Sequence, residues 1–161
     1  EILIGLVGSE MCIRDSLHVA DKISTQKMDA TTVHEHFAPD TFDKILVDAP
    51  CSGIGLIRRK PDIKYNKENQ DFNALQEIQL QILDSVCQTL RKGGIITYST
   101  CTIFDEENFQ VINKFLATHP NFEQVKLSHT QEDIVRDGCI AITPEQYQTD
   151  GFFIGQVKRI L

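Results

Sequence analysis

Short apolar runs alternate with longer apolar repeats along this chain. Continuous apolar runs occur at 45–47 and 95–96, and each is bounded by polar or turn residues. Such runs are typical of strands that are covered on both faces of a sheet. We therefore predict strands over 43–49 and 95–99. Related patterns predict three further strands, over 23–28, 122–127 and 151–158.

Two longer segments repeat apolar residues at intervals of three and four. In the first segment, 68–91, the repeating positions are Leu75, Ile78, Ile82, Val86 and Leu90. This spacing places the apolar side chains on one face of a helix, which we expect Gly93-Gly94 to end. A second helix is predicted from 105 to about 119, with acidic residues at its start. Its expected buried face consists of Phe109, Ile112, Phe115 and Leu116.

The alternation of strands with helices predicts an α/β sheet with mostly parallel strands. The segment 128–148 has a mixed pattern from which we infer no regular element. The length of 161 residues suits one domain. No apolar run approaches the roughly 20 residues that a membrane-spanning helix needs, so we expect no membrane contact.

Charge and cysteine content narrow the possible functions. The chain has 16 Lys and Arg against 23 Asp and Glu, a net charge of −7, which argues against a general DNA coat or a polybasic membrane binder. Its five cysteines, at 12, 51, 87, 101 and 139, lack C-x-x-C spacing, so we expect no structural metal site. The start of the chain does not resemble a secretory signal, so we expect a cytoplasmic protein with reduced thiols.

Reactive side chains follow three of the predicted strands. Asp29 follows the first, the segment Asp48-Ala49-Pro50-Cys51 ends the second, and Thr100-Cys101 follows the third. Ligands of open α/β sheets bind outside the carboxyl ends of the strands, so these loops could share one cleft. A thiolate in a polar loop is a usable nucleophile, whereas a buried cysteine only packs. Spacing alone leaves both interpretations open, while Cys87 is expected to lie in the core.

The segment 58–67 is basic in an otherwise acidic chain. It holds five basic residues, one acidic residue and a tyrosine. Basic side chains pair with a phosphate backbone and a tyrosine can stack on a base, although a merely solvated loop is the alternative. Its position directly after the Cys51 loop favours substrate contact. The residues that we expect to contact RNA are Arg58, Arg59, Lys60, Lys64 and Tyr65.

Four motifs occur in a specific order. They are DAPCSGIG at 48–55, RRKPD at 58–62, YSTCT at 98–102 and DGFF at 150–153. Together they resemble the RNA cytosine-5 methyltransferase family, specifically its bacterial branch that acts on small-subunit (16S) ribosomal RNA. The resemblance runs from about residue 17 to 161. It implies a Rossmann-type fold that uses S-adenosylmethionine, with an antiparallel C-terminal strand and with the first strands of the sheet missing.

The resemblance also implies roles for single residues. Cys101 would be the nucleophile that adds to carbon 6 of a cytosine, which makes carbon 5 reactive toward a methyl group. Cys51 would help to release the product, and Asp48 would contact the target cytosine. Asp29 would lie near the adenosine end of the cofactor, with Asp48 and Pro50 also beside the cofactor. Since the base must leave any stack, the expected substrate is single-stranded or locally opened ribosomal RNA.

Residues 1–16 depart from the family pattern. The family's Gly-rich cofactor loop should precede residue 17, and the glycines at 5 and 8 lack its chemistry. We expect 1–16 to be an artefactual segment and 17–161 to be the C-terminal part of a catalytic domain. Without the first strands an exposed sheet edge would remain. We therefore expect this chain alone to be poorly stable and impaired in activity.

Two other functions stay open at this point. A non-catalytic RNA-binding module would use the 58–67 segment, and its RNA binding would survive the loss of Cys51 and Cys101. A thiol redox protein would instead form a reversible disulfide between those two cysteines. The missing C-x-x-C motif argues against the redox function.

Overall fold

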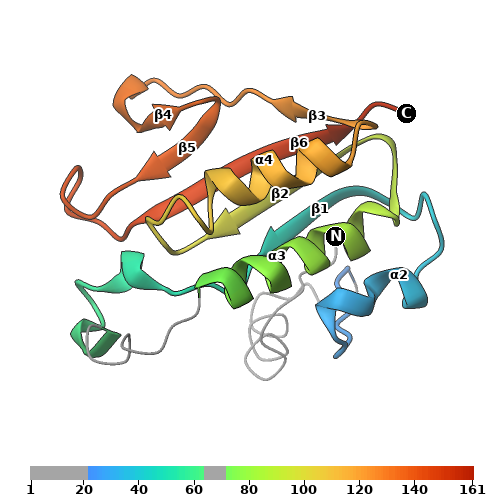
Figure 1. Ribbon diagram of the computed structural model, residues 1–161, viewed down its shortest axis with the longest axis horizontal. Coiled ribbons are helices and arrows are strands. Elements are labelled where there is room, and N and C mark those ends of the chain that lie inside the picture. Colours follow the sequence, from blue (N-terminus) through green and yellow to red (C-terminus); the bar gives the residue numbers. More distant parts are fainter. Residues whose placement is uncertain (1–21, 64–71) are drawn as a thin grey trace.

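The computed structural model describes residues 22–63 and 72–161 (Figure 1). The labels α, β and η denote α-helices, strands and short 3-10 helices. In chain order the elements are η1 (Ala30–Thr32), α2 (Val33–His36), β1 (Phe42–Asp48), η2 (Ile54–Leu56), α3 (Phe72–Cys87), β2 (Leu90–Thr100), α4 (Phe109–Thr118), β3 (Phe122–Val125), η4 (Glu132–Ile134), β4 (Val135–Arg136), β5 (Cys139–Ile142) and β6 (Phe152–Arg159).

The described strands form one mixed sheet in the order β1-β2-β6-β5-β4. β1 and β2 run parallel, and their register places Asp48 opposite Ser99. β6 runs antiparallel to β2, with Thr100 opposite Phe153. The other long edge of β6 pairs first with β5 and then with β3, both antiparallel. The α/β sheet with an antiparallel C-terminal strand is therefore confirmed. The prediction of mostly parallel strands is not met within the described residues, where β1 and β2 are the one parallel pair and the other pairs are antiparallel.

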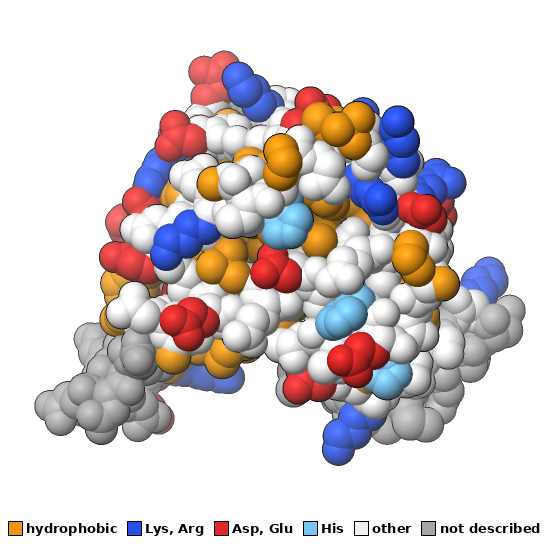
Figure 2. Space-filling view, turned by 45° about the vertical axis from the view of Figure 1, so that its right-hand side comes forward, with side chains coloured by type: hydrophobic (Ala, Val, Ile, Leu, Met, Phe, Trp, Pro, Cys, Tyr) orange, Lys and Arg blue, Asp and Glu red, His pale blue; other side chains and the backbone are white. Residues whose placement is uncertain are grey.

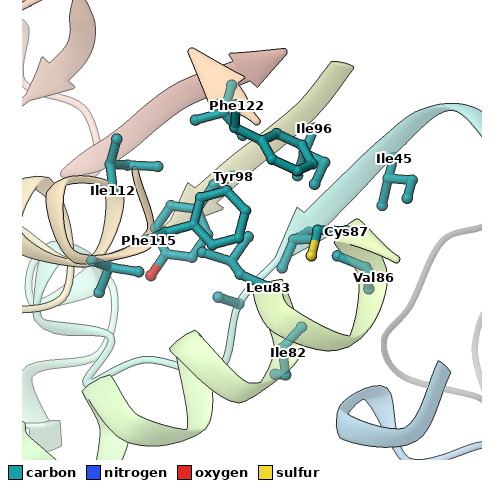
Figure 3. Close-up of a cluster of buried hydrophobic side chains, with 14 of the residues drawn as sticks. Ile45, Ile82, Leu83, Val86, Cys87, Ile96, Tyr98, Ile112, Phe115 and Phe122 are labelled. Atoms are coloured by element: carbon teal, nitrogen blue, oxygen red, sulfur yellow. The ribbon is translucent and has the colours of Figure 1, made fainter. Parts of the chain in front are cut away.

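The two long helices, α3 and α4, cover the same face of the sheet (Figure 1). Leu83 and Val86 of α3 and Phe115 of α4 lie in one buried cluster with Ile96 and Tyr98 of β2, and all five are fully buried (Figure 3). Complete burial of each such apolar side chain contributes about 1.5–3 kcal/mol. This layer fixes the distance between α3 and the carboxyl ends of β1 and β2.

The opposite face of the sheet is covered less completely. On β1, the buried Ile45 and Val47 flank the half-buried Leu46. On β2, Ile95 and Thr97 are likewise half-buried, whereas the residues between and after them are buried. The strand 45–47 is expected from its sequence to be covered on both faces. The face that carries Ile45 and Val47 is fully covered, because α3 and α4 both lie on it, whereas the face that carries Leu46 is covered only in part.

The strands expected over 43–49, 95–99, 122–127 and 151–158 are confirmed with shifted ends. The strand expected over 23–28 is wrong, since this segment has no regular structure. A strand requires a hydrogen-bonded neighbour, and no strand in the described residues pairs with this segment.

Gly93-Gly94 do not end the first helix, contrary to the prediction. Thr89 ends it instead, because its backbone N–H and its hydroxyl both donate to the Val86 carbonyl, at 3.1 and 2.8 Å. The two glycines lie inside β2. Gly93 has a φ of 79°, which glycine tolerates, and it lies where the pairing of β2 with β1 shifts register.

The predicted apolar face of α3 is only partly correct. Ile82 and Val86 are buried, but Ile78 is 40% exposed, while Gln76 and Gln79 point inward and are buried. The second helix begins at Phe109 rather than at 105, because 105–108 forms turns. Its buried face is Phe109, Val111, Ile112 and Phe115, with Leu116 half-buried. The segment 128–148, for which the sequence predicts no regular element, contains η4, β4 and β5.

Candidate active site

Two cysteines from separate loops lie side by side. The sulfur atoms of Cys51 and Cys101 are 3.4 Å apart, although fifty positions separate them in the chain. Cys51 follows the carboxyl end of β1 and Cys101 follows that of β2, so the parallel register brings the two loops together. Both thiols are free and half-buried. The expectation that these loops meet is confirmed.

The contact between the thiols makes them chemically unequal. A hydrogen bond from the Cys51 thiol lowers the pKa of Cys101 to about 7, although burial and the nearby Asp48 act in the opposite direction. The same hydrogen bond, followed by burial, raises the pKa of Cys51 far above its ordinary value. Near neutral pH, Cys101 is therefore partly thiolate while Cys51 keeps its proton. Since the thiolate is the reactive form, Cys101 is the better nucleophile.

Buried polar side chains that the sequence analysis missed surround the Cys51 loop. Glu107 is fully buried, and its Oε1 accepts from the Ser52 backbone N–H at 2.8 Å and from Gln79 Nε2 at 3.2 Å. Gln79 Nε2 also donates to the Pro50 carbonyl at 2.9 Å. From the sequence, Glu107 is expected only to be one of the acidic residues at the start of the second helix. The available signal was polar residues recurring at inward helical spacing in α3, at Gln76 and Gln79.

The Cys101 loop has its own polar support. The Thr100 hydroxyl donates to Asn108 Oδ1 at 2.5 Å, and Asn108 Nδ2 donates to the Thr102 carbonyl at 3.0 Å. The Ser52 and Thr102 hydroxyls are hydrogen-bonded to each other at 2.8 Å. The residues directly after the two cysteines are thus joined, which fixes one loop relative to the other.

The DGFF segment at 150–153 packs against the Cys51 loop. Gly55 donates its N–H to the Cys101 carbonyl at 3.0 Å, and Gly151 donates to the Gly55 carbonyl at 2.8 Å. Arg59 pairs with Asp150, with Nε to Oδ1 at 3.1 Å. The loop before β6 is therefore bound to the Cys51 loop, which in turn is hydrogen-bonded to Cys101.

The residues expected to contact RNA have mixed surroundings. Arg59 is engaged by Asp150, and Arg58 donates to the Pro144 carbonyl at 3.3 Å. Lys60 is exposed. Lys64 and Tyr65 lie outside the described residues. Both arginines therefore have hydrogen-bond partners within the fold. The RNA contacts of all five residues stay predictions.

The three residues expected to contact the cofactor are all exposed and lie in two separate parts of the fold. Asp48 ends β1, and its Oδ1 accepts from the Ser99 hydroxyl at 3.3 Å. Pro50 is exposed two residues later. Asp29 caps η1, which packs against α3, and its described contacts do not include the cysteine loops. Hydrogen bonds from the backbone N–H and the hydroxyl of Thr31, both to Oδ1, lower the pKa of the Asp29 carboxyl.

A groove of about 510 Å³ lies elsewhere, at the amino end of β2. Its lining includes Asp84, His119 and Arg159, and the Arg159 guanidinium donates to the Leu90 carbonyl at the start of β2. The cysteines instead follow the opposite, carboxyl ends of β1 and β2, so this groove is separate from the thiol site. Figure 2 shows one face of the molecule, over which positive and negative side chains are both spread.

No helix in residues 22–63 and 72–161 has the length and apolar character required to cross a membrane. Within the same residues, no three His, Cys, Asp or Glu side chains are grouped so that they could hold a metal ion.

Comparisons with known proteins agree with the motifs. A family model described as 16S rRNA methyltransferase RsmB/F matches residues 14–158. The chain is 46% identical to the probable ribosomal RNA small subunit methyltransferase B of Bacillus subtilis, over 85% of this chain and 32% of that relative. The crystal structure of PH0851 superimposes with a TM-score of 0.85 at 28% identity, covering 96% of this chain and 36% of that one.

The structure of NSun6 from Pyrococcus horikoshii with SFG shares the fold, with a TM-score of 0.68 at 23% identity over 92% of this chain and 37% of that one. The chain thus spans about a third of the length of these proteins. The family match includes both cysteine loops and all but a few residues of the described part. The chain belongs to the RsmB/F family of 16S rRNA methyltransferases.

Proposed function

We propose that this chain carries the catalytic thiols of a cytoplasmic enzyme that methylates carbon 5 of a cytosine in ribosomal RNA. The observation that carries this proposal is the thiol pair, with its sulfur atoms 3.4 Å apart and the pKa of Cys101 lowered to about 7. A nucleophile requires a deprotonated thiol, and release of the product benefits from a protonated partner next to it.

The chemistry follows from these two protonation states. The Cys101 thiolate forms a bond to carbon 6 of the cytosine, and the displaced electron pair makes carbon 5 a nucleophile. S-adenosylmethionine, when bound, supplies the methyl group that carbon 5 takes up. The proton on carbon 5 then leaves to a base, and its electron pair breaks the bond between carbon 6 and the Cys101 sulfur. Cys51, which holds a proton beside that sulfur, assists this elimination.

Two exposed carboxylates, Asp48 at the end of β1 and Asp29 at the start of η1, fit the other parts of this reaction. Asp48 is exposed beside the thiols, where its carboxyl can reach the cytosine ring or the cofactor, and Pro50 borders the same space. The Asp29 carboxyl, whose pKa the two Thr31 hydrogen bonds lower, is exposed and suits an acceptor for the ribose hydroxyls of the cofactor. Its Oδ2 is free of the two Thr31 hydrogen bonds, which both fall on Oδ1.

The RNA must present its cytosine unstacked, because both faces of the ring are needed for attack and methyl transfer. Single-stranded or locally opened ribosomal RNA satisfies this requirement. Lys60, which is exposed, is the described member of the basic segment that is best placed for a phosphate. Lys64 and Tyr65 follow it in sequence and would extend the same contact.

The test replaces each thiol in the longest gene product that contains this chain. Cys51→Ala should accumulate a covalent RNA adduct, because attack continues while release fails. Cys101→Ala should form no adduct and transfer no methyl group. Cys139→Ala is the matched control, since Cys139 is a free cysteine buried in β5. Normal turnover by the Cys51 variant would contradict the roles assigned to the two thiols.

A further inference from the structure

Each of the two cysteines is held by hydrogen bonds to the residues on both sides of it. The Pro50 carbonyl and the Ser52 N–H flank Cys51, and they bond to Gln79 and Glu107. The Thr100 hydroxyl and the Thr102 carbonyl flank Cys101, and both bond to Asn108. Glu107 and Asn108 are neighbours in the chain, so one short turn supports both thiols.

A glutamate at position 107 lowers the stability of the fold. It is the one carboxylate among the fully buried side chains of the described residues. Its Oε2, like Gln79 Oε1, is buried without a hydrogen-bond partner in the described structure. A buried, half-satisfied carboxyl lowers the stability of a fold compared with an apolar residue of similar size. Stability alone therefore does not account for a glutamate here.

The turn that carries Glu107 and Asn108 is itself anchored. The fully buried Tyr98 donates its hydroxyl to the Glu107 carbonyl at 2.7 Å. The N–H groups of Glu107 and Asn108 donate to the carbonyls of Phe104 and Asp105. Because the turn cannot shift without breaking these contacts, its two side chains hold both cysteine loops at a fixed separation.

We propose that Glu107 and Asn108 are positioning residues for the methyl-transfer reaction, Glu107 for Cys51 and Asn108 for Cys101. The assignment rests on the proposed function for its role in catalysis. It extends that function by predicting two different defects. Loss of the Glu107 side chain mainly impairs release of the product, whereas loss of the Asn108 side chain mainly impairs attack on carbon 6.

Substitutions at Glu107 separate positioning from charge. The negative charge of Glu107 by itself raises the pKa of Cys101 slightly, whereas the hydrogen bond from Cys51 lowers it. Glu107→Gln removes the charge but keeps an acceptor for the Ser52 N–H, so Cys101 should titrate at or just below about 7. Glu107→Ala also frees the Cys51 loop, so the midpoint should rise toward the roughly 8.5 of an exposed thiol. A purely electrostatic role would move both variants downward.

The first experiment measures iodoacetamide alkylation of each cysteine against pH, by mass spectrometry, in the longest gene product that contains this chain. It requires neither RNA nor methyl donor, so it tests the positioning even if the protein transfers no methyl group. Asn108→Ala should also raise the Cys101 midpoint, because it removes both the acceptor for the Thr100 hydroxyl and the donor to the Thr102 carbonyl. Unchanged profiles for Glu107→Ala and Asn108→Ala would overturn the proposal.

The second experiment follows turnover and covalent adducts with RNA. At a pH of about 9, where Cys101 is mostly thiolate in the variant as well, Glu107→Ala should lower turnover on the order of 100-fold while adduct accumulates. Asn108→Ala should lower the rate of adduct formation itself, measured with RNA containing 5-fluorocytosine, from which carbon 5 cannot lose a proton. Glu107→Gln should keep most of the activity. Equal losses of attack and release in both alanine variants would show a merely structural role.

Two further variants distinguish a loss of positioning from a general loss of packing. Gln79→Met keeps the helix and removes the donor to Pro50 and Glu107, so it should show the Glu107→Ala defect in weaker form. Ser85→Ala is the matched control, because Ser85 is also buried on α3 and bonds to His34 through both the His34 N–H and its ring. If Ser85→Ala shifted the Cys101 midpoint as much as Glu107→Ala, the assignment would be refuted.

Discussion

Gly55 and Gly151 approach each other so closely that neither position has room for a side chain. A Cβ on Gly55 would lie 2.2 Å from the Gly151 carbonyl oxygen and 2.8 Å from the Cys101 carbonyl oxygen. Gly55 thus packs against both the loop before β6 and Cys101, so the segment that leads into the C-terminal strand takes part in building the site.

Gly55→Ala should therefore disturb both stability and the thiols. We expect a loss of about 1–3 kcal/mol or more in the free energy of unfolding, because the backbone atoms that meet the new methyl group cannot rotate away. Urea unfolding measures this loss. Gly53→Asn is the control in the same loop, since Gly53 has open space around it and a φ of 69° that asparagine tolerates. Equal effects of the two variants would contradict the close-packing argument.

Reactivity of Cys101 should change with pH around neutrality. Its pKa is lowered to about 7, so alkylation by iodoacetamide should accelerate from pH 6 to 8 and then level off. Cys51, whose pKa is raised, should react slowly throughout this range. Rates for single cysteines come from mass spectrometry of peptides. Faster alkylation of Cys51 than of Cys101 at pH 7 would show that the proton lies on the other sulfur.

The same shift should appear in stability. Between about pH 7 and the ordinary pKa of a thiol, Cys101 binds fewer protons folded than unfolded. Its contribution to the free energy of unfolding is therefore present above the unfolded pKa and is lost as pH falls toward 7. The raised pKa of Cys51 acts in the opposite sense above the unfolded pKa. Urea midpoints of wild type and Cys101→Ser across pH 6–9 should differ most at the alkaline end.

Hydrogen peroxide should join the two thiols in a disulfide. The Cys101 thiolate takes one oxygen from the peroxide to become a sulfenic acid, and the Cys51 sulfur, 3.4 Å away, then displaces water. Tryptic mapping should find this pair crosslinked, with Cys87 and Cys139 still free. Such a disulfide that formed reversibly in a protein without methyl transfer would favour the thiol redox function instead.

Phe115 should be the costliest core residue of α4 to remove. It is fully buried, stacks on His119 with ring centroids 4.2 Å apart, and meets Phe122 edge-on at 5.2 Å. We expect Phe115→Ala to lower the free energy of unfolding by about 3–5 kcal/mol. Leu116→Ala, next to it and only half-buried, should cost clearly less. Chemical denaturation of the two variants compares them directly.

Lys60→Ala should weaken RNA binding through the loss of one phosphate contact. The slope of log affinity against log salt should then fall by about 0.7 for a single strand. Lys92→Ala serves as control, since Lys92 is an exposed lysine near the amino end of β2, away from the thiols. Titrations at several salt concentrations give the slopes. Identical slopes for wild type and Lys60→Ala would remove Lys60 from the RNA surface.

The meeting of the cysteine loops could be predicted because two strands, 43–49 and 95–99, showed strong local patterns. Parallel pairing then brought their ends together. The supporting residues could not be predicted in this way. Gln79 and Glu107 are polar, and polar side chains normally favour solvent, so their burial depends on tertiary hydrogen bonds that no local pattern records. The strand expected at 23–28 failed for a related reason, since a strand is defined by its neighbour.

The thiol contact has a consequence for how the protein can be monitored. The lowered pKa of Cys101 arises mainly from the Cys51 thiol, which is brought near only by the pairing of β1 with β2. An unfolded chain has two ordinary, slowly reacting thiols in place of this pair. Rapid labelling of Cys101 at neutral pH is thus a built-in reporter of the folded state, readable in a crude mixture without any assay of methyl transfer.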